Sequence, residues 1–303
     1  MNIQQFNYIL SVAEYRHFET AAEKCHVAQS TLSTMISKFE DEIGIKIFDR
    51  RKKPVEITYE GQAILSHLKR IIYEIDQLKE FVNELKGEVK GEIKIGCIPT
   101  IAPFLYPLFL QDFSLHYPEL YIEVRELTTF EIEKSLLNRE LDIGIVSTDM
   151  IMKELEKHNI YKEEFVLFDA SNRTIKDVEV KHLNMENFWL LEDGHCMRTQ
   201  VLEICELANP QLNPKLNINY KAGSIDSLLR FVKANKGKTL LPAMAIQGFS
   251  IEEMNYIRYF QNDVPFRING LVTHPHFAKT QILNALINEI KISVSTLKGV
   301  KLI

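Results

Sequence analysis

A single long helix, predicted for residues 60–86, divides this chain into two parts. The stretch contains no proline and one glycine, Gly61, and its apolar residues recur at alternating steps of four and three. These apolar positions are Ile64, Leu68, Ile71, Ile75, Leu78, Val82 and Leu85. A heptad seam of this length needs another helix to pack against, and a second copy of the chain is the most economical partner. The alternative is an ordinary long helix that packs on its own domain.

The composition is that of a globular protein of roughly two domains. The 303 residues are 46% hydrophobic and 25% charged, which is enough apolar material for a substantial core. The N-terminus has no basic leader before an apolar core, and no apolar run reaches 18 residues. We therefore expect a soluble, cytoplasmic protein with no membrane partner. Four cysteines are too few for a disulfide framework, so free thiols are expected.

Residues 1–58 are predicted to form short helices followed by a two-stranded hairpin. Apolar residues at helical spacing indicate a first helix from Ile3 and a second short helix around Phe18. A third helix is expected to open near Gln29, with Ser30 or Thr31 as its N-cap, and to end before Gly44. Two short helices joined by a tight turn are typical of a helix-turn-helix. The alternation in IKIFDRRKKPVEIT predicts a two-stranded wing around a basic turn.

The third helix and the basic turn carry the candidate DNA-binding side chains. The net charge of −5 gives no sign of nucleic-acid binding, and residues 1–90 hold 13 Lys and Arg against 14 Asp and Glu. The case rests on Gln29, Ser30, Thr31, Ser33, Thr34, Ser37 and Lys38 on the helix, and on Arg50, Arg51, Lys52 and Lys53 in the turn. Such side chains suit base edges and phosphates of a major groove. A solvated helix beside a basic loop is the alternative, but the order of the elements favours a winged DNA reader.

After Gly87 and Gly91, strands and helices alternate, which predicts an α/β domain with parallel sheets. Strands are expected at residues 91–99, 120–127, 141–146, 165–170, 188–192, 216–220, 239–242, 255–260 and 267–274. Helices are expected near residues 104–116, 130–139, 196–207, 224–234 and 278–296. In such folds, ligands bind at the carboxyl ends of strands and against helix N-termini.

Residues 17–65 resemble the N-terminal domain of the LysR-type transcriptional regulators, and the layout of residues 91–300 is similar to their effector domain. The resemblance implies an α/β protein with an N-terminal all-α winged helix-turn-helix at 1–58 and a coiled-coil linker helix at 59–87. At 91–303 it implies a periplasmic-binding-protein-like effector domain of two subdomains, 91–163 with 268–303, and 164–267. It further implies a transcriptional activator that is a homotetramer, a dimer of dimers, on double-stranded promoter DNA. RNA polymerase would be a further partner, and no cofactor is expected.

The segment LLEDGHCMRTQVLEIC is similar to the redox segment of the peroxide-sensing members of that family. Carried over position by position, the resemblance implies that Cys196 is the peroxidatic cysteine and Cys205 the resolving one. Hydrogen peroxide would be contacted by Thr100, Thr129, His195 and Arg267. The family segment usually continues Arg-Asp-Gln, and this chain departs from it at Thr199.

The spacing of the two cysteines sets a condition on any disulfide. Nine positions along one continuous helix place two Cα atoms about 13.5 Å apart, whereas a disulfide tolerates at most about 7 Å. Cys196 and Cys205 therefore either do nothing together or react only when the helix between them unwinds. We expect Cys196 at a helix N-terminus, where the helix dipole, and Arg267 if it folds nearby, would lower the thiol pKa.

Other interpretations stay open at this point. In one, Cys196 and Cys205 are small core residues with inert thiols. In another, the chain is a LysR-type regulator of a small anionic metabolite held by Thr100, Thr129 and Arg267. A thiol peroxidase is a third, which the helix-turn-helix disfavours, so we expect a regulator and not an enzyme.

The remaining cysteines and a histidine pair are assigned no function. Cys25 and Cys97 are expected to be structural. His274 and His276 are expected in a loop without metal, because no Cys-x-x-Cys or His-Glu-x-x-His motif accompanies them.

Overall fold

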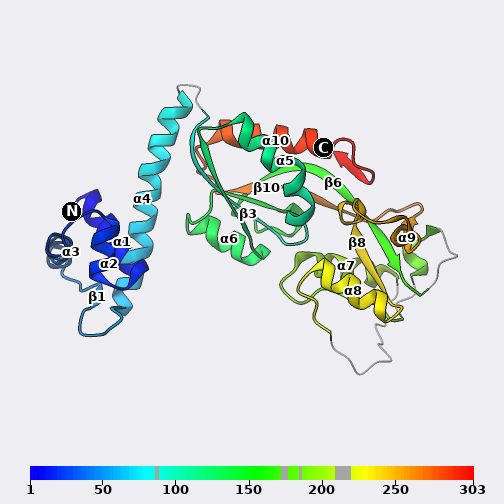
Figure 1. Ribbon diagram of the computed structural model, residues 1–303, viewed down its shortest axis with the longest axis horizontal. Coiled ribbons are helices and arrows are strands. Elements are labelled where there is room, and N and C mark those ends of the chain that lie inside the picture. The colour runs from blue at the N-terminus through cyan, green and yellow to red at the C-terminus, as the bar shows by residue number, and fades with distance from the viewer. Residues whose placement is uncertain (86–88, 172–176, 184–185, 209–219) are drawn as a thin grey trace. The chain divides into compact units, whose positions relative to one another are not determined.

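The computed structural model describes residues 1–85, 89–171, 177–183, 186–208 and 220–303. The chain divides into two compact units, Met1–Lys86 and Gly87–Ile303 (Figure 1). The first is helical with a small hairpin, and the second is a mixed α/β unit. The predicted fold class is confirmed.

The first unit contains three short helices, a hairpin and one long helix. They are α1 (Ile3–Tyr15), α2 (Phe18–Lys24), α3 (Gln29–Ile43), β1 (Phe48–Asp49), β2 (Glu56–Ile57) and α4 (Tyr59–Leu85). The predicted N-cap of α3 is wrong, because its N-cap residue is Ala28 and no side chain caps the helix. Ser30 and Thr31 instead lie inside the first turn, with exposed side chains. Gly44 ends α3 in the left-handed conformation, at φ 71°.

A buried carboxylate joins α3 to the wing formed by β1 and β2. Glu40 is 1% exposed, and its Oε1 accepts the N–H groups of Ile47 at 2.8 Å and Phe48 at 3.3 Å. The other oxygen, Oε2, accepts from Arg50 at 3.3 Å. Charge-assisted hydrogen bonds in a buried setting are strong, so Glu40 determines where β1 begins relative to the helix.

The long helix α4 has two kinds of surface. Near its start, a Cβ at Gly61 would lie 2.5 Å from the carbonyl oxygen of Ile47, so only glycine fits this close approach. Leu65 and Leu68 are buried in the core of the first unit. Farther along, the exposed apolar residues are Ile71, Leu78, Phe81 and Val82. The first part of the helix therefore packs on its own unit, and the later part leaves apolar surface uncovered.

The second unit contains strands β3 to β11 and helices α5 to α10. The strands are β3 (Gly91–Cys97), β4 (Leu120–Glu126), β5 (Ile143–Ser147), β6 (Glu156–Asp169), β7 (Asp177–Val178), β8 (Lys238–Pro242), β9 (Ile257–Phe260), β10 (Phe266–Thr273) and β11 (Val300–Leu302). The helices are α5 (Ala102–His116), α6 (Thr129–Leu137), α7 (Cys196–Ala208), α8 (Ile225–Ala234), α9 (Ile251–Met254) and α10 (Thr280–Val294). Short 3-10 helices are η1 (Thr148–Met150), η2 (Val180–His182) and η3 (Ala243–Ile246).

The sheet is mixed, which corrects the expectation of parallel sheets. Its order is β4-β3-β5-β10-β6-β9-β7, with β8 and β11 also paired to β6. Strand β3 is parallel to β4 and β5, but β10 is antiparallel to both β5 and β6. The physical reason is the chain path: β6 carries the chain into the second half of the unit, and β10 brings it back beside β6.

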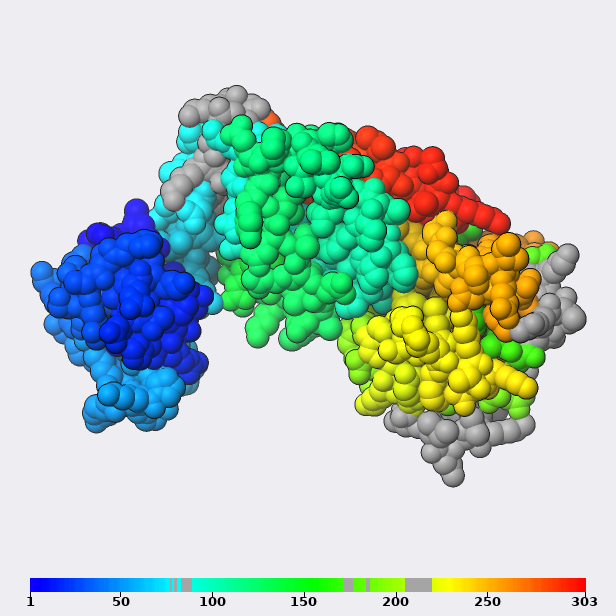
Figure 2. Space-filling model, viewed as in Figure 1, coloured from blue at the N-terminus to red at the C-terminus, as the bar shows by residue number. Residues whose placement is uncertain are grey.

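Two hydrophobic cores lie along β6. Its residues up to Tyr161 belong to a first core with β3, α5, α6 and α10, and those from Phe165 belong to a second core with α7, α8 and β8. In Figure 1, α5 and α10 cover one side of the first core's strands and α6 the other. In Figure 2, the lobe around the first core is mainly green and red, and the lobe around the second core is mainly yellow and orange. The subdomain boundary at 163/164 stays a prediction.

Two predicted strands have no matching strand among the described residues. Residues 188–192 form isolated bridges only, at Phe188 and Leu191, so the strand predicted there is wrong. The strand predicted at 216–220 lies outside the described residues except for Tyr220. Over the described ranges, no helix is both long enough and apolar enough to cross a membrane.

Replacing Glu40 with alanine should destabilise the α3–wing junction by about 2–4 kcal/mol, because Arg50 and two buried N–H groups would lose their acceptor. Hydrogen-exchange mass spectrometry of the full chain should show faster exchange at residues 36–50. An exposed α1 residue is the matched control, since Glu14→Ala should change the free energy of opening by less than about 0.5 kcal/mol. Equal exchange in the two variants would contradict this assignment.

Candidate functional site

The predicted DNA-facing residues gather on one part of the first unit. On α3, the side chains of Gln29, Ser30, Thr31, Thr34 and Lys38 are exposed, and those of Ser33 and Ser37 are half-buried. All four wing cations, Arg50, Arg51, Lys52 and Lys53, are exposed. The helix face thus presents short polar groups next to a basic hairpin, as a major-groove reader requires.

Three of the wing cations also have partners within the chain. Arg50 donates to Ser33 on α3 at 2.9 Å, pairs with Glu40, and lies 4.8 Å from the ring centre of Phe18. Arg51 pairs with Asp49, and Lys52 with Glu56. Arg50 therefore holds the wing against α3. The ion pairs of Arg51 and Lys52 lie at the surface and are weak, so a phosphate could replace their carboxylate partners.

Cys196 is the first residue of α7 and follows a turn at Asp193 and Gly194. Gly194 has φ 101°, a left-handed conformation that favours glycine. Arg198 fixes this turn, because its Nη1 donates to the carbonyl oxygen of Leu191 at 2.8 Å and its Nε lies 2.9 Å from Asp193. The predicted position of Cys196 at a helix N-terminus is what the structure shows.

The Cys196 thiol is buried, and burial controls its acidity. Desolvation raises the pKa of Cys196, while the Arg267 charge, the Thr129 hydroxyl and the first N–H groups of α7 act to lower it. The net direction is upward. The expected lowering is therefore wrong, although each predicted contribution has the expected sign, because sequence reasoning did not anticipate how deeply the sulfur is buried.

Arg267 on β10 is the charged centre of the site. It is 1% exposed, and it donates from Nη1 to Thr100 Oγ1 at 3.1 Å and from Nη2 to the Thr100 carbonyl oxygen at 3.0 Å. On its other side, Nε lies 2.9 Å from Oε2 of Glu163, which is fully buried on β6. The structure thus brings Arg267 together with Thr100, as predicted, and adds a carboxylate that the prediction missed.

Glu163 and Asn269 extend this buried network. Glu163 Oε2 also accepts from Asn269 Nδ2 at 2.7 Å, and its Oε1 accepts the N–H of Met244 at 2.8 Å. A sequence offers little sign of such partners, because β6 and β10 are more than 100 residues apart at this contact. One signal was present, since Arg267 and Asn269 alternate along a buried strand and so face the same side.

Gln200 is a further residue that sequence reasoning missed. It lies one helical turn after Cys196, is buried, and donates from Nε2 to Ser147 Oγ at 2.8 Å. Thr199, the position at which the chain departs from the family pattern, is exposed. Side chains four apart share a helix face, so Gln200 and Cys196 point to the same side.

The buried Gln200 Oε1 has no hydrogen-bond partner among the described residues. Thr129 and Asn269 act on the Cys196 thiol and on the Tyr161 hydroxyl, respectively. Buried polar atoms in folded proteins are nearly always paired, so Gln200 Oε1 can accept a hydrogen bond from a small polar molecule. His195 is buried beside Cys196, as its position in the sequence requires.

Cys205 also lies on α7, so nine helical positions separate it from Cys196. That spacing along a helix corresponds to about 13.5 Å between Cα atoms. The side chain of Cys205 lies outside the described residues. Cys97 is fully buried on β3, where desolvation raises its pKa well above the usual thiol range.

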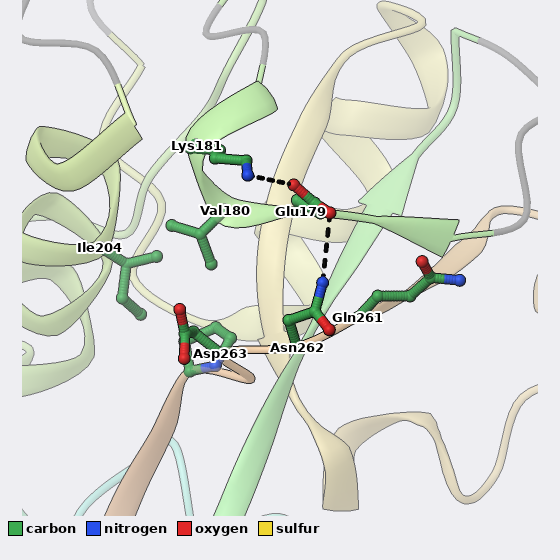
Figure 3. A pocket seen from close by; sticks show the side chains of 8 residues that line it. Glu179, Val180, Lys181, Ile204, Gln261, Asn262 and Asp263 are labelled. Carbon is green, nitrogen blue, oxygen red and sulfur yellow. Dashed lines mark hydrogen bonds and ion pairs between the residues drawn. The ribbon is translucent and has the colours of Figure 1, made fainter.

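A cavity of about 340 Å³ adjoins the later part of α7 (Figure 3). Ile204 of α7 faces Val180 of η2 and Pro265 across it. At its rim, Glu179 pairs with Lys181 at 2.8 Å and accepts from Asn262 at 3.2 Å. Ile204 itself is buried in the second core, so the cavity borders that core at the surface.

The histidine pair lies in the loop after β10, as predicted. His276 donates its N–H to His274 Nδ1 at 3.1 Å. Nowhere in the described ranges do three or more His, Cys, Asp or Glu gather as a metal site.

Comparisons with known proteins identify the class. A family described as "Bacterial regulatory helix-turn-helix protein, lysR family" matches residues 3–62, and the "LysR substrate binding domain" matches residues 86–293. The chain belongs to the LysR family of transcriptional regulators.

Particular relatives share one description. The chain is 30% identical to the hydrogen peroxide-inducible genes activator of Haemophilus influenzae over 91% of each protein. It is 32% identical to the DNA-binding transcriptional dual regulator OxyR of Escherichia coli, over 81% of this chain and 80% of that protein. A full-length OxyR variant from Pseudomonas aeruginosa matches its fold with a TM-score of 0.78 at 26% identity, covering 99% of this chain and 98% of that one.

The reactivity of Cys196 should increase steeply with pH. Because the pKa of its thiol is raised, the thiolate fraction, and with it the rate of alkylation by iodoacetamide, should rise about tenfold per pH unit from 7 to 8.5 without reaching a plateau. Peptide mass spectrometry of the quenched reaction would follow Cys196 separately from the other thiols. A plateau below pH 8 would show instead that the positive groups outweigh burial.

Proposed function

We propose that this LysR-family protein is a cytoplasmic transcriptional regulator that senses hydrogen peroxide through a reversible Cys196–Cys205 disulfide. The observation that carries the proposal is the position of Cys196: buried at the N-terminus of α7, and within the electrostatic reach of Arg267 and Thr129. The similarity to the hydrogen peroxide-inducible genes activator of Haemophilus influenzae and to OxyR of Escherichia coli supports the proposal.

The first chemical step is attack of the Cys196 thiolate on one peroxide oxygen. The O–O bond breaks, a sulfenic acid forms on Cys196, and the leaving hydroxide takes a proton to become water. Arg267 favours the thiolate, and Thr100, Thr129 and His195 are the peroxide-contacting residues of the proposal. The Gln200 amide oxygen and the Thr129 hydroxyl oxygen can accept hydrogen bonds from a small molecule with two O–H donors.

The second step is condensation with Cys205. Its sulfur attacks the sulfenic sulfur, water leaves, and the disulfide forms. Because the helical spacing is incompatible with a disulfide, α7 must unwind between the cysteines, breaking the Gln200–Ser147 hydrogen bond.

The output is a change in DNA binding. The polar face of α3 would enter the major groove, and the wing would contact the phosphate backbone. The exposed apolar residues of α4 support pairing with a second copy, and a dimer of dimers would place reading helices on successive half-sites. Contact with RNA polymerase on the promoter completes the activator role.

An alternative ligand, a small anionic metabolite, is disfavoured by Arg267. This guanidinium already pairs with Glu163 and donates to Thr100, so an incoming carboxylate would have to displace a buried carboxylate. We also propose that the protein is not an enzyme: each oxidation would leave the sensor in a changed state until a reductant restores it.

One equivalent of hydrogen peroxide should convert the reduced protein to a Cys196–Cys205 disulfide, with Cys25 and Cys97 still thiols. Non-reducing peptide mass spectrometry would locate the bond. Cys205→Ser should stop at a trappable sulfenic acid, and Cys196→Ser should form neither species. Free Cys196 and Cys205 thiols in the wild type after treatment would refute the proposed sensor.

Neutralising Arg51 and Lys52 together should weaken DNA binding irrespective of sequence. Each lost phosphate contact should reduce the slope of log affinity against log salt by about one, as fluorescence anisotropy at several salt concentrations would measure. Lys301→Ala in the second unit, which removes another exposed cation, is the matched control. If control and double variant show the same slope, the wing does not contact phosphates.

A further inference from the structure

The contact between Arg267 and Glu163 raises a question that the proposed function leaves unanswered. Arg267 is a cation that acts on Cys196, yet it shares the buried network with a fully buried carboxylate. Glu163 Oε2 lies 2.9 Å from Arg267 Nε and 2.8 Å from Nη2. The positive charge of Arg267 would favour the Cys196 thiolate more strongly if Glu163 were not paired with it.

We propose that Glu163 is a positioning residue that sets the peroxide sensitivity of Cys196, by orienting Arg267 and partly neutralising its charge. This inference rests on the proposed function of the Cys196 site. Glu163 acts on Cys196 through Arg267.

The geometry gives Glu163 a fixed orientation. One carboxylate oxygen accepts the backbone N–H of Met244, and the other accepts from Arg267 and from Asn269. These partners come from η3 and β10, while Glu163 stands on β6, so three segments fix the carboxylate in place. The guanidinium is held equally firmly, since its far side donates twice to Thr100.

The electrostatic consequence follows from the low polarity of the site. A buried charge interacts strongly with its neighbours, and a paired opposite charge reduces its effect on a third group. While it is paired with Glu163, Arg267 lowers the Cys196 pKa too little to overcome burial, and the net direction stays upward. The resting thiol is then mostly protonated, which protects a buried cysteine from low background levels of peroxide.

Other titratable groups face this site from each neighbouring element. They are Tyr161 on β6, Cys97 on β3, Tyr106 on α5, Glu126 on β4 and His195 next to Cys196. Burial raises the pKa of Tyr161, Tyr106 and Cys97 well above the usual values. To remove any histidine titration, each Glu163 variant is also measured in a His195→Asn background.

The test is the pH dependence of Cys196 alkylation in the reduced full-length protein, read by peptide mass spectrometry. Glu163→Gln keeps the size of the side chain but removes its charge, so the uncompensated Arg267 should lower the Cys196 pKa by up to about one unit and speed alkylation at pH 7 by about three- to tenfold. Glu163→Asp keeps the charge at a shorter reach and should give a smaller increase. The neighbouring half-buried residue Glu164 provides the matched control, since Glu164→Gln removes a charge paired with Lys301 and should leave the profile unchanged.

Folding is verified by near-ultraviolet circular dichroism. If Glu163→Gln does not fold, the Glu163→Asp variant provides the test. If Glu163 serves only in packing, the pH profile of Cys196 alkylation in that variant stays at the wild-type position. An unchanged or upward-shifted pKa in the folded variant overturns the inference. Peroxide treatment of the same samples separates the two proposals. If the wild type forms the disulfide but the Cys196 pKa is unchanged in the Glu163 variants, only the role of Glu163 is refuted. If the wild type forms no disulfide, the proposed sensor is refuted.

Discussion

The buried ion pair between Arg267 and Glu163 is the interaction on which the second unit depends. It joins β10 to β6, the two strands that carry the chain between the lobes, and through Thr100 it also holds the loop after β3. Taking one partner away from a buried pair typically costs about 3–5 kcal/mol, because the other charge is left without compensation. Thr100, the Arg267 guanidinium and the adjacent strands therefore form one rigid frame, and Cys196 approaches that frame from α7.

Cys196 is held between two opposing influences. Burial favours the neutral thiol, while the helix N-terminus and Arg267 favour the thiolate, and burial prevails. A buried thiol near a fixed cation is stable in the absence of oxidant, but the same cation stabilises the charge that develops when the thiol reacts. The helix that carries Cys196 is anchored at its start, through Arg198 and Gln200.

In the first unit, too, a charged side chain has a structural role. Its wing carries four cations, yet Arg50 serves chiefly to tie the hairpin to α3 through Ser33 and Glu40. These contacts fix the basic turn relative to the polar face of α3. They do so in a unit whose acidic residues slightly outnumber its basic ones. The later apolar residues of α4 remain exposed on the single chain, which is the expected state of a helix whose seam is completed by a second copy.

Local patterns in the sequence determined a good deal of this protein. The heptad spacing predicted α4, the order of short helices and hairpin predicted the DNA-reading unit, and the Glu-Asp-Gly-His turn placed Cys196 at a helix N-terminus. Those features depend on residues close together in the chain, where helical periodicity and turn chemistry act. The depth at which Cys196 is buried, the pairing of Arg267 with Glu163, and the role of Gln200 were decided only by tertiary structure. Each brings together residues from distant segments, and burial and charge pairing have no local signature, because they depend on which surfaces pack against one another.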